Sequence, residues 1–436
     1  MDTSNVYRTA EESGASVEEL IILCCIRLQA GTREVDQLTK LLQSGVEWDT
    51  LVQLARAWYF YLSPLLYLQL STVCPTLVPP DVMERLRIDF QSNAQHNAKL
   101  IRELLTIVER FNREGIPIVP YKDPLSARKV YGNVALRVFH DLDVFIHEGD
   151  VARATEILRT QGYTLIPRID GIGEALEVAI ARDRLFAKDP ASYSRVLADR
   201  AGPFDFANDR AGTLELHWDF SLGRQLSITR NNEQLWARAR KDPVDGTHVC
   251  SFSPEDSLLV ACIHGTIVHL WRFLRLIVDV AGLITAHIDL NWDDLVTIAR
   301  QRGCLRILTI GLLLANEVAG APLPEDVRQR LDHDPRTRAY VQRVAVRLFQ
   351  ETTWKTDLPA PTGGFAFLGF PFLRYMLFMQ ERVRDKCYSL LRAMMLPEES
   401  DVKMLPSLAS HTKVFYLLHP VLMVVRRLQY RLKPRA

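Results

Sequence analysis

The stretch VALRVFHDLDVFIHEGD, residues 134–150, places two aspartates, Asp141 and Asp143, inside a run that otherwise has the pattern of a buried strand. Side chains alternate along a strand, so both carboxylates point to the same face, with Cβ atoms about 7 Å apart. Two ionised carboxylates at that distance repel each other unless a positive group lies between them. Mg²⁺, which takes oxygen ligands and leaves positions for water and phosphate, is the natural occupant.

A second acidic strand is predicted further along the chain. In TLELHWDFS, Glu215, His217 and Asp219 occupy alternate positions and therefore share a face. If this strand runs antiparallel beside the first, Glu215 comes within reach of the aspartate pair and completes a site for two metal ions. Asp219 and His217 are the alternatives for the third ligand. His217 is expected rather to order the strand through hydrogen bonds, because Mg²⁺ prefers oxygen.

Two basic residues lie near these strands. Arg137 precedes Asp141 by four residues, and Lys122 follows the short strand-like run IPIVPY at 116–121. Both are candidate partners for a triphosphate, with simple ion pairing to the aspartates as the alternative. The sequence contains no Walker A motif, and the GIG at 171–173 is too short for a dinucleotide fingerprint.

Apolar periodicity divides the chain into four segments. Residues 1–115 predict an N-terminal helical region, and residues 116–222 predict an α/β core with a polar insertion at about 170–200. Residues 223–350 predict a helical domain, and residues 351–436 predict a linker followed by a basic helical tail. The expected architecture is a mixed α/β core held between two helical regions.

Several local signals fix the ends of these elements. Asp150 is expected to cap a helix that ends at Gly162, and Ser253 is expected to begin a long helical run. On that run His264 and His269 lie five residues apart, which predicts different helix faces and a packing role rather than a zinc site. PFDFAND and TLELHWDFS are expected to pair as an antiparallel hairpin.

Composition limits the class of protein. The net charge is +1, which argues against charge-driven binding to nucleic acid. The seven cysteines form no CxxC pair and are expected to be buried thiols in a reducing cytoplasm. The polar start lacks an apolar signal core, and no run approaches the ~20 apolar residues of a membrane span, so a cytoplasmic protein is expected. The basic end RRLQYRLKPRA is expected to be a solvated helix face, with a membrane surface or an acidic partner as the alternative.

The order of these motifs resembles the uncharacterised nucleotidyltransferase family of the DNA polymerase β-type superfamily. The resemblance runs from the helix around Trp48 to the basic tail, and the aspartate strand is its strongest element. It differs at Asp123, where the family prefers glycine, and in lacking the glycine-serine signature of many polymerase β-type enzymes. The residues that carry it are Lys122, Arg137, Asp141, Asp143, Gly162, Tyr163, Glu215, Leu216, His217, Trp218, His264, Gly265, His269, Trp271 and Asp279.

This resemblance implies an α+β fold in which a small mixed-sheet nucleotidyltransferase core is flanked by helical regions. It implies that Asp141 and Asp143 bind Mg²⁺, and that Glu215 binds a second ion and helps to deprotonate an acceptor hydroxyl. A nucleoside monophosphate would pass from an NTP such as ATP to a small molecule, sugar or peptide in a bacterial biosynthetic pathway, and pyrophosphate would leave. The nucleotide-binding residues would be Lys122, Arg137 and His217.

Two alternatives stay open at this stage. A non-catalytic relative with the same fold would bind a nucleotide, or a protein partner through the helical regions, and Asp123 favours it because it adds bulk and negative charge after Lys122. An RNA-modifying or toxin-like transferase suits the superfamily, but the near-neutral charge of the chain gives it little support.

Overall fold

The computed structural model describes residues from Ala10 onward with several gaps. The residues outside the description are 1–9, 11, 13, 28–30, 58–60, 167–203, 209–211, 221–231, 351–368, 396–403, 406–416, 423 and 426–436. The insertion expected at about 170–200 and the whole of the basic end RRLQYRLKPRA therefore lie outside the described residues.

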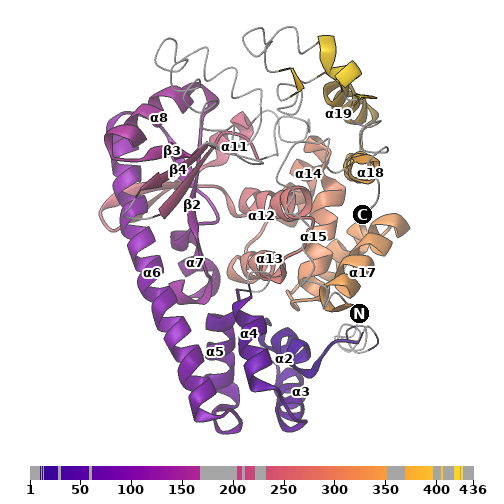
Figure 1. Ribbon diagram of the computed structural model, residues 1–436. Coiled ribbons are helices and arrows are strands. Elements are labelled where there is room, and N and C mark those ends of the chain that lie inside the picture. Colours follow the sequence, from indigo (N-terminus) through magenta and orange to yellow (C-terminus); the bar gives the residue numbers. More distant parts are fainter. Residues whose placement is uncertain are drawn as a thin grey trace.

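A five-stranded sheet forms the α/β core (Figure 1). Its order is β1-β2-β5-β4-β3, and only the β2–β5 pair is parallel. The expected hairpin of β4 and β5 is confirmed. The fold is α+β with a small mixed sheet, as expected. The strands are Ile118–Pro120 (β1), Asp141–Ile146 (β2), Thr164–Ile166 (β3), Phe204–Asn208 (β4) and Gly212–His217 (β5).

The parallel pairing of β2 with β5 corrects the antiparallel pairing that the sequence suggested. Helix α8 (Val151–Thr160) follows β2 and returns the chain to the end of the sheet at which β2 begins. Strand β3 therefore runs in the same direction as β2. The chain then reverses at β4 and again at β5. The two reversals cancel, and the register places Asp143 beside Glu215 and Asp141 beside Thr213.

One face of the sheet is sealed by helices. Helix α6 (Pro80–Arg113) runs from the sheet down to the N-terminal helices (Figure 1), and its C-terminal half packs with α8 against this face. Gly162 ends the α8 segment with a φ of +85°, which is the left-handed conformation expected of a C-terminal glycine. The strand residues buried on this face are Leu142, Val144, Ile146, Leu214 and Leu216.

The N-terminal and C-terminal helices share a second core. Leu20 and Leu51 from the helices before the sheet belong to one cluster of buried apolar side chains with Leu308, which lies on a helix after the sheet. Phe145 joins it from the other face of the sheet. The helices before the sheet are α2 (Val17–Cys25), α3 (Thr32–Gln43), α4 (Trp48–Arg56) and α5 (Ser63–Val73), with a 3₁₀ turn at Pro75–Leu77.

Helices also dominate the chain after the sheet. A two-stranded hairpin, β6 (Arg240–Val244) and β7 (Thr247–Ser251), is the described exception. The helices are α11 (Glu233–Arg238), α12 (Pro254–Ile263), α13 (Leu274–Ala286), α14 (Trp292–Arg302), α15 (Leu305–Glu317), α16 (Glu325–Leu331), α17 (Pro335–Gln350), α18 (Gly369–Met379) and α19 (Val383–Met395). Within the described residues, no helix has the length and apolar content of a bilayer-spanning segment.

The long helical run expected from Ser253 is interrupted. Ser253 caps α12 as expected, but a π-helical turn follows at His264–Val268, and Leu270 and Trp271 both have a φ of +54°. The buried Trp271 ring packs on Gly265, where a Cβ atom would lie 2.6 Å from the ring. The chain therefore bends sharply before α13 begins.

Between β1 and β2 the chain forms α7 (Pro124–Tyr131) and a 3₁₀ turn at Val134–Leu136, and a further 3₁₀ turn at Glu148–Asp150 leads into α8. Asp150 occupies the N-cap position of α8, as expected, but its side chain makes no capping bond. The cysteines are free thiols, as expected, but the expectation that all are buried is wrong, because Cys387 is exposed and Cys250 is half-buried.

Candidate functional site

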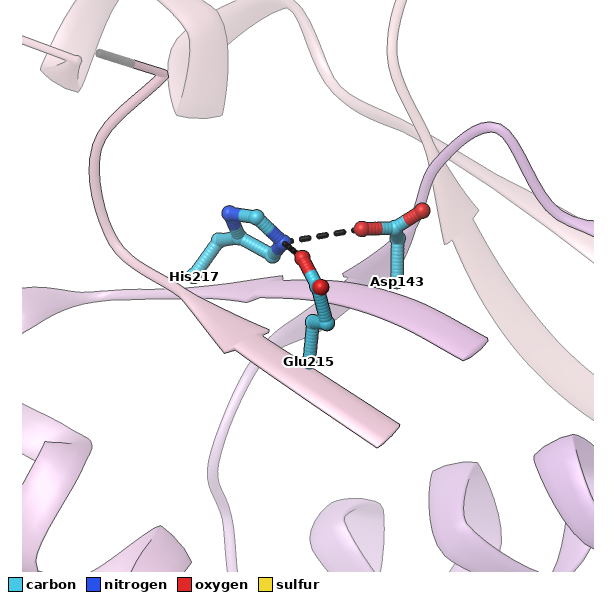
Figure 2. A group of neighbouring side chains, drawn as sticks. All are labelled: Asp143, Glu215 and His217. Atoms are coloured by element: carbon cyan, nitrogen blue, oxygen red, sulfur yellow. Dashed lines mark hydrogen bonds and ion pairs between the residues drawn. The ribbon is translucent and has the colours of Figure 1, made fainter. Parts of the chain in front are cut away.

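Asp143, Glu215 and His217 converge on the face of the sheet opposite to the sealed one (Figure 2). The parallel register puts Glu215 beside Asp143, and His217 lies two residues further along β5 on the same face. His217 Nε2 lies 2.8 Å from Asp143 Oδ1 and 3.1 Å from Glu215 Oε2. Ligand atoms of all three lie within 4.8 Å of one another, so the group can hold a metal ion.

Hydrogen bonding decides the charge of the histidine and the central aspartate. Burial lowers the pKa of His217, but its bonds to Asp143 and Glu215 outweigh burial and raise the pKa above the usual value. Burial raises the pKa of Asp143, but the charge of Lys122 and the bond from His217 hold that pKa well below the usual range. Asp143 is therefore an anion that faces the ammonium group of Lys122 and forms a hydrogen bond with His217.

Lys122 reaches the same aspartate from the end of β1. Its Nζ atom lies 3.1 Å from Asp143 Oδ2 and 3.1 Å from Nε2 of His264. The backbone of Lys122 has a φ of +51°, and the N–H of Tyr121 donates to the carbonyl oxygen of Asp143. The ammonium group thus lies against the acidic cluster with a neutral acceptor on its other side.

Asp123 has a structural task that the sequence did not reveal. It is the N-cap of α7, and its carboxylate accepts hydrogen bonds from the N–H groups of Leu125 and Ser126. The side chain is buried, and burial raises its pKa. One of its carboxylate oxygens caps the helix, so the presence of an acidic residue after Lys122 has a structural explanation.

Asp141 lies at the start of β2, half-buried and beside the cluster rather than within it. Burial and the charges of Asp143 and Glu215 raise the pKa of Asp141 to about 6, against the opposing charges of Lys122 and Arg137. This repulsion is the one expected from two aspartates that share a strand face. A cation at this place would relieve it.

Arg137 is held by a partner that the sequence did not suggest. Its Nε and Nη2 atoms donate to the two carboxylate oxygens of Asp279, at 2.8 and 3.0 Å, and Tyr131 donates its hydroxyl to the same carboxylate at 2.5 Å. Burial raises the pKa of Asp279, but Arg137 outweighs burial and lowers it. The bidentate pair joins the loop before β2 to α13.

His264 and His269 meet, although the sequence placed them on different faces of one helix. The π-helical turn brings their rings to 4.5 Å between centroids, in an edge-to-face arrangement. Burial and the charge of Lys122 lower the pKa of His264 well below its usual value and that of His269 to about 3. Both rings are neutral, so Nε2 of His264 accepts a hydrogen bond from the ammonium group of Lys122.

The third-ligand alternatives are separated by the structure. Among the described residues, Glu215 and His217 both lie in the cluster with Asp143, and Asp219 does not. Asp219 comes after the end of β5. The expectation that Glu215 reaches the aspartate strand is thus consistent with the geometry, although the strand runs parallel.

A cavity of about 760 Å³ adjoins this site. Helices α7, α12 and α13 and the β6–β7 hairpin enclose it, and its size suits a small molecule. Asp143, Glu215 and His217 do not line it, so the cavity and the acidic cluster are neighbours that share Lys122. Its lining includes Lys122, Tyr131, Arg137, His264, Leu276 and Asp279.

Comparison with known proteins gives one match. The model of a family described as uncharacterised nucleotidyltransferase matches residues 44–320, which is more than half of the chain. The match covers the five-stranded sheet, the acidic cluster and helices α12 to α15. Neither a curated protein nor a solved structure matches the chain.

Proposed function

The chain belongs to the uncharacterised nucleotidyltransferase family, and on that premise we propose that it is a Mg²⁺-dependent enzyme that moves a nucleoside monophosphate from an NTP to an acceptor hydroxyl. The observation that carries the proposal is the convergence of Asp143, Glu215 and His217 within 4.8 Å, with Asp141 at the start of the same strand. Carboxylates gathered on one strand face are the donors that Mg²⁺ prefers.

The donor set fits such an ion. Asp141, Asp143 and Glu215 supply carboxylate oxygens from one face of two paired strands, and burial and the charges of the other two carboxylates raise the pKa of Asp141. These three residues would hold up to two ions. When bound, Mg²⁺ neutralises triphosphate charge and orients the phosphoryl group for in-line transfer.

Glu215 is the proposed base for the acceptor hydroxyl. Its side chain is 22% exposed, whereas that of Asp143 is 7% exposed, so Glu215 is the more accessible to a substrate. His217 holds the Glu215 carboxylate by a hydrogen bond of 3.1 Å, which fixes its direction. The proton of the hydroxyl would pass to this carboxylate.

Lys122 is the proposed contact for the triphosphate, because it reaches the cluster from a different strand and borders the neighbouring cavity. That cavity is the proposed place of the acceptor. Contacts of Arg137 and His217 with the nucleotide stay predictions, since Arg137 pairs with Asp279 and His217 with the two carboxylates. A cytoplasmic location, a bacterial biosynthetic role and the four-segment division stay predictions as well.

The test is transfer of label. The full chain is incubated with Mg²⁺ and each α-labelled NTP, with and without sugars, peptides and tRNA, while pyrophosphate release is measured. Label on an acceptor together with pyrophosphate supports the proposal, and label on tRNA alone selects the RNA-modifying alternative. Tight NTP binding without pyrophosphate release from any acceptor would establish a non-catalytic relative. That alternative is favoured by one observation, that Lys122 and His217 occupy both oxygens of Asp143.

A further inference from the structure

Arg275 is a basic residue near the acidic cluster that the sequence motifs did not single out. It is the second residue of α13, just after the bend that follows the π-helical turn. Its Nε atom is sealed from solvent and has no hydrogen-bond partner, and in the part of the chain that the structure describes the side chain has no ion pair. A buried donor without a partner destabilises a fold, because it has lost its hydrogen bonds to water without replacing them.

The partners that Arg275 would ordinarily take are engaged elsewhere. Asp279, one turn along α13, is held by the bidentate bond from Arg137 and by Tyr131. Arg275 instead lies over two aromatic rings, with its guanidinium carbon 5.4 Å from the centroid of Tyr61 and 5.5 Å from that of Phe273. The rings fix the direction of the side chain and leave its hydrogen-bond donors unused.

A chain of contacts connects this guanidinium to the acidic cluster. Lys122 bridges Asp143 and His264, the His264 ring meets the His269 ring, and the His269 ring lies 4.9 Å from that of Phe273. Phe273 is the N-cap of α13, the helix on which Arg275 lies, and no side chain caps the N–H groups of its first turn.

Electrostatics support this placement. Burial and the charge of Arg137 lower the pKa of Arg275, while the carboxylates of Asp279 and Asp141 act in the opposite direction. Arg275 therefore interacts electrostatically with Asp141 but forms no ion pair with it. An uncapped helix start and a guanidinium with unused donors, next to a proposed metal site, form a surface suited to a multivalent anion.

We propose that Arg275, with the first turn of α13, binds the polyphosphate chain of the nucleotide substrate. This inference rests on the proposed function and extends it, since it gives the triphosphate a second cationic contact besides Lys122. Arg275 is a binding residue in this assignment. Its planar fork of donors can contact two phosphate oxygens at once, which the ammonium group of Lys122 cannot do.

The experiment measures binding of Mg²⁺ complexes of the four NTPs, the matching nucleosides and tripolyphosphate to the full chain by calorimetry. Arg275→Gln is expected to raise the Kd for NTP about ten- to hundredfold, because charge-assisted hydrogen bonds are lost, and to leave nucleoside binding unchanged. Arg275→Lys, which keeps the charge but not the fork, is expected to give an intermediate Kd. Arg300→Gln is the matched control, since Arg300 is exposed on α14 and is expected to bind like the wild type.

Thermal unfolding separates a binding role from a structural one. Arg275→Gln removes a half-buried cation whose sealed Nε atom has no hydrogen-bond partner, so the Tm of the ligand-free protein is expected to stay equal or rise. A Tm that falls by several degrees with an unchanged Kd for NTP would make Arg275 a structural residue and overturn the inference. If Arg275→Gln does not fold, Arg275→Lys decides the question in the same assay, and a wild-type Kd for NTP then overturns the inference.

The outcomes also separate this inference from the proposed function. If the wild type binds NTP and Arg275→Gln binds it equally well, the role of Arg275 is refuted and the proposed function stands. If the wild type binds none of the NTPs, the proposed function fails. Tripolyphosphate binding that depends on Arg275 would then still establish the anion site, and the lack of any tripolyphosphate binding would refute both.

Discussion

The two faces of strand β2 differ in polarity, in charge and in the side chains that they contact. Leu142, Val144 and Ile146 are fully buried against α6 and α8 in an apolar core. Asp141 and Asp143, which alternate with them, lie on the other face among lysine, histidine and carboxylate side chains. Because its side chains alternate, one strand has two roles. The first face is apolar and stabilises the fold, and the second carries Asp143, whose charge Lys122 and His217 stabilise, and Asp141, whose pKa burial and the neighbouring carboxylates raise. Substitutions on the two faces should therefore have different consequences.

The largest effect is expected from Asp143→Asn. The substitution keeps the shape of the side chain and removes the charge that the proposed ion, Lys122 and His217 all share, so nucleotidyl transfer should fall about 10³-fold or more. Initial rates of pyrophosphate release, measured with circular dichroism to verify folding, test this. Asp49→Asn is the control, because Asp49 is exposed on α4 in a surface ion pair. Full activity of a folded Asp143→Asn protein would contradict the proposed site.

The polar side of the sheet also contains a charge pair with a structural role. Asp279→Asn leaves Arg137 buried without its bidentate partner, and the free energy of unfolding should fall by about 3–5 kcal/mol. Chemical denaturation measures it. Asp242→Asn breaks the exposed pair with Lys129 and should change the same quantity by less than about 1 kcal/mol. Equal effects of the two substitutions would show that the Arg137–Asp279 pair contributes no more to the free energy of unfolding than an exposed pair does.

On the apolar face, Leu214→Ala should lower the free energy of unfolding by about 2–5 kcal/mol, because it removes buried methyl groups and leaves a cavity in a tightly packed core. The rate of transfer by the folded protein, measured well below its Tm, should stay within about twofold of the wild type, since Leu214 points away from Glu215. Denaturant unfolding and activity assays on the same sample separate the two quantities. A loss of activity as large as that of Asp143→Asn would show that the faces are not independent.

The local sequence pattern predicted strands β2 and β5 and the face on which their carboxylates lie, but not the relative direction of the two strands. The alternation in β2 and β5 specified the strands, and the carboxylates on one face followed from the same alternation. The direction of β5 relative to β2 depends on the path through α8, β3 and β4, which no short stretch encodes. Glu215 was nevertheless placed correctly beside the aspartate strand, because alternation fixes the face in either direction.

The polar residues around the cluster were harder to assign. Arg137 was expected near a triphosphate, yet its partner is Asp279, 142 residues away, and sequence spacing carries no information about such a contact. The meeting of His264 and His269 requires a π-helical turn and two residues with positive φ, for which helical periodicity gives no signal. Arg275 had the pattern of an ordinary helix residue. Only the structure reveals that it lies half-buried near the site, just after the bend before α13.

The smallest expected effect concerns the charge of Asp141 and its dependence on pH. The pKa of Asp141 is about 6 in the folded protein, against an ordinary value of 3.8. Between these pH values the folded state holds a proton that the unfolded state has released, so stability falls as the pH rises from about 4 to 6, by at most about 3 kcal/mol. Asp141→Asn has no such proton. In the absence of metal it should therefore be more stable than the wild type at pH 7, and this advantage should shrink at pH 4.5.

Denaturant unfolding of both proteins at the two pH values, with EDTA present, measures this difference directly, and Asp49→Asn serves as the control for nonspecific effects of pH. Addition of Mg²⁺ at pH 7 should then stabilise the wild type more than Asp141→Asn, because an ion bound there offsets the repulsion that Asp143 and Glu215 exert on Asp141. A stability difference that does not change with pH would mean that the Asp141 carboxylate is solvated and apart from the other two. The charged face of β2 would then be reduced to Asp143 and its two partners, and the third carboxylate would have to be removed from the proposed metal site.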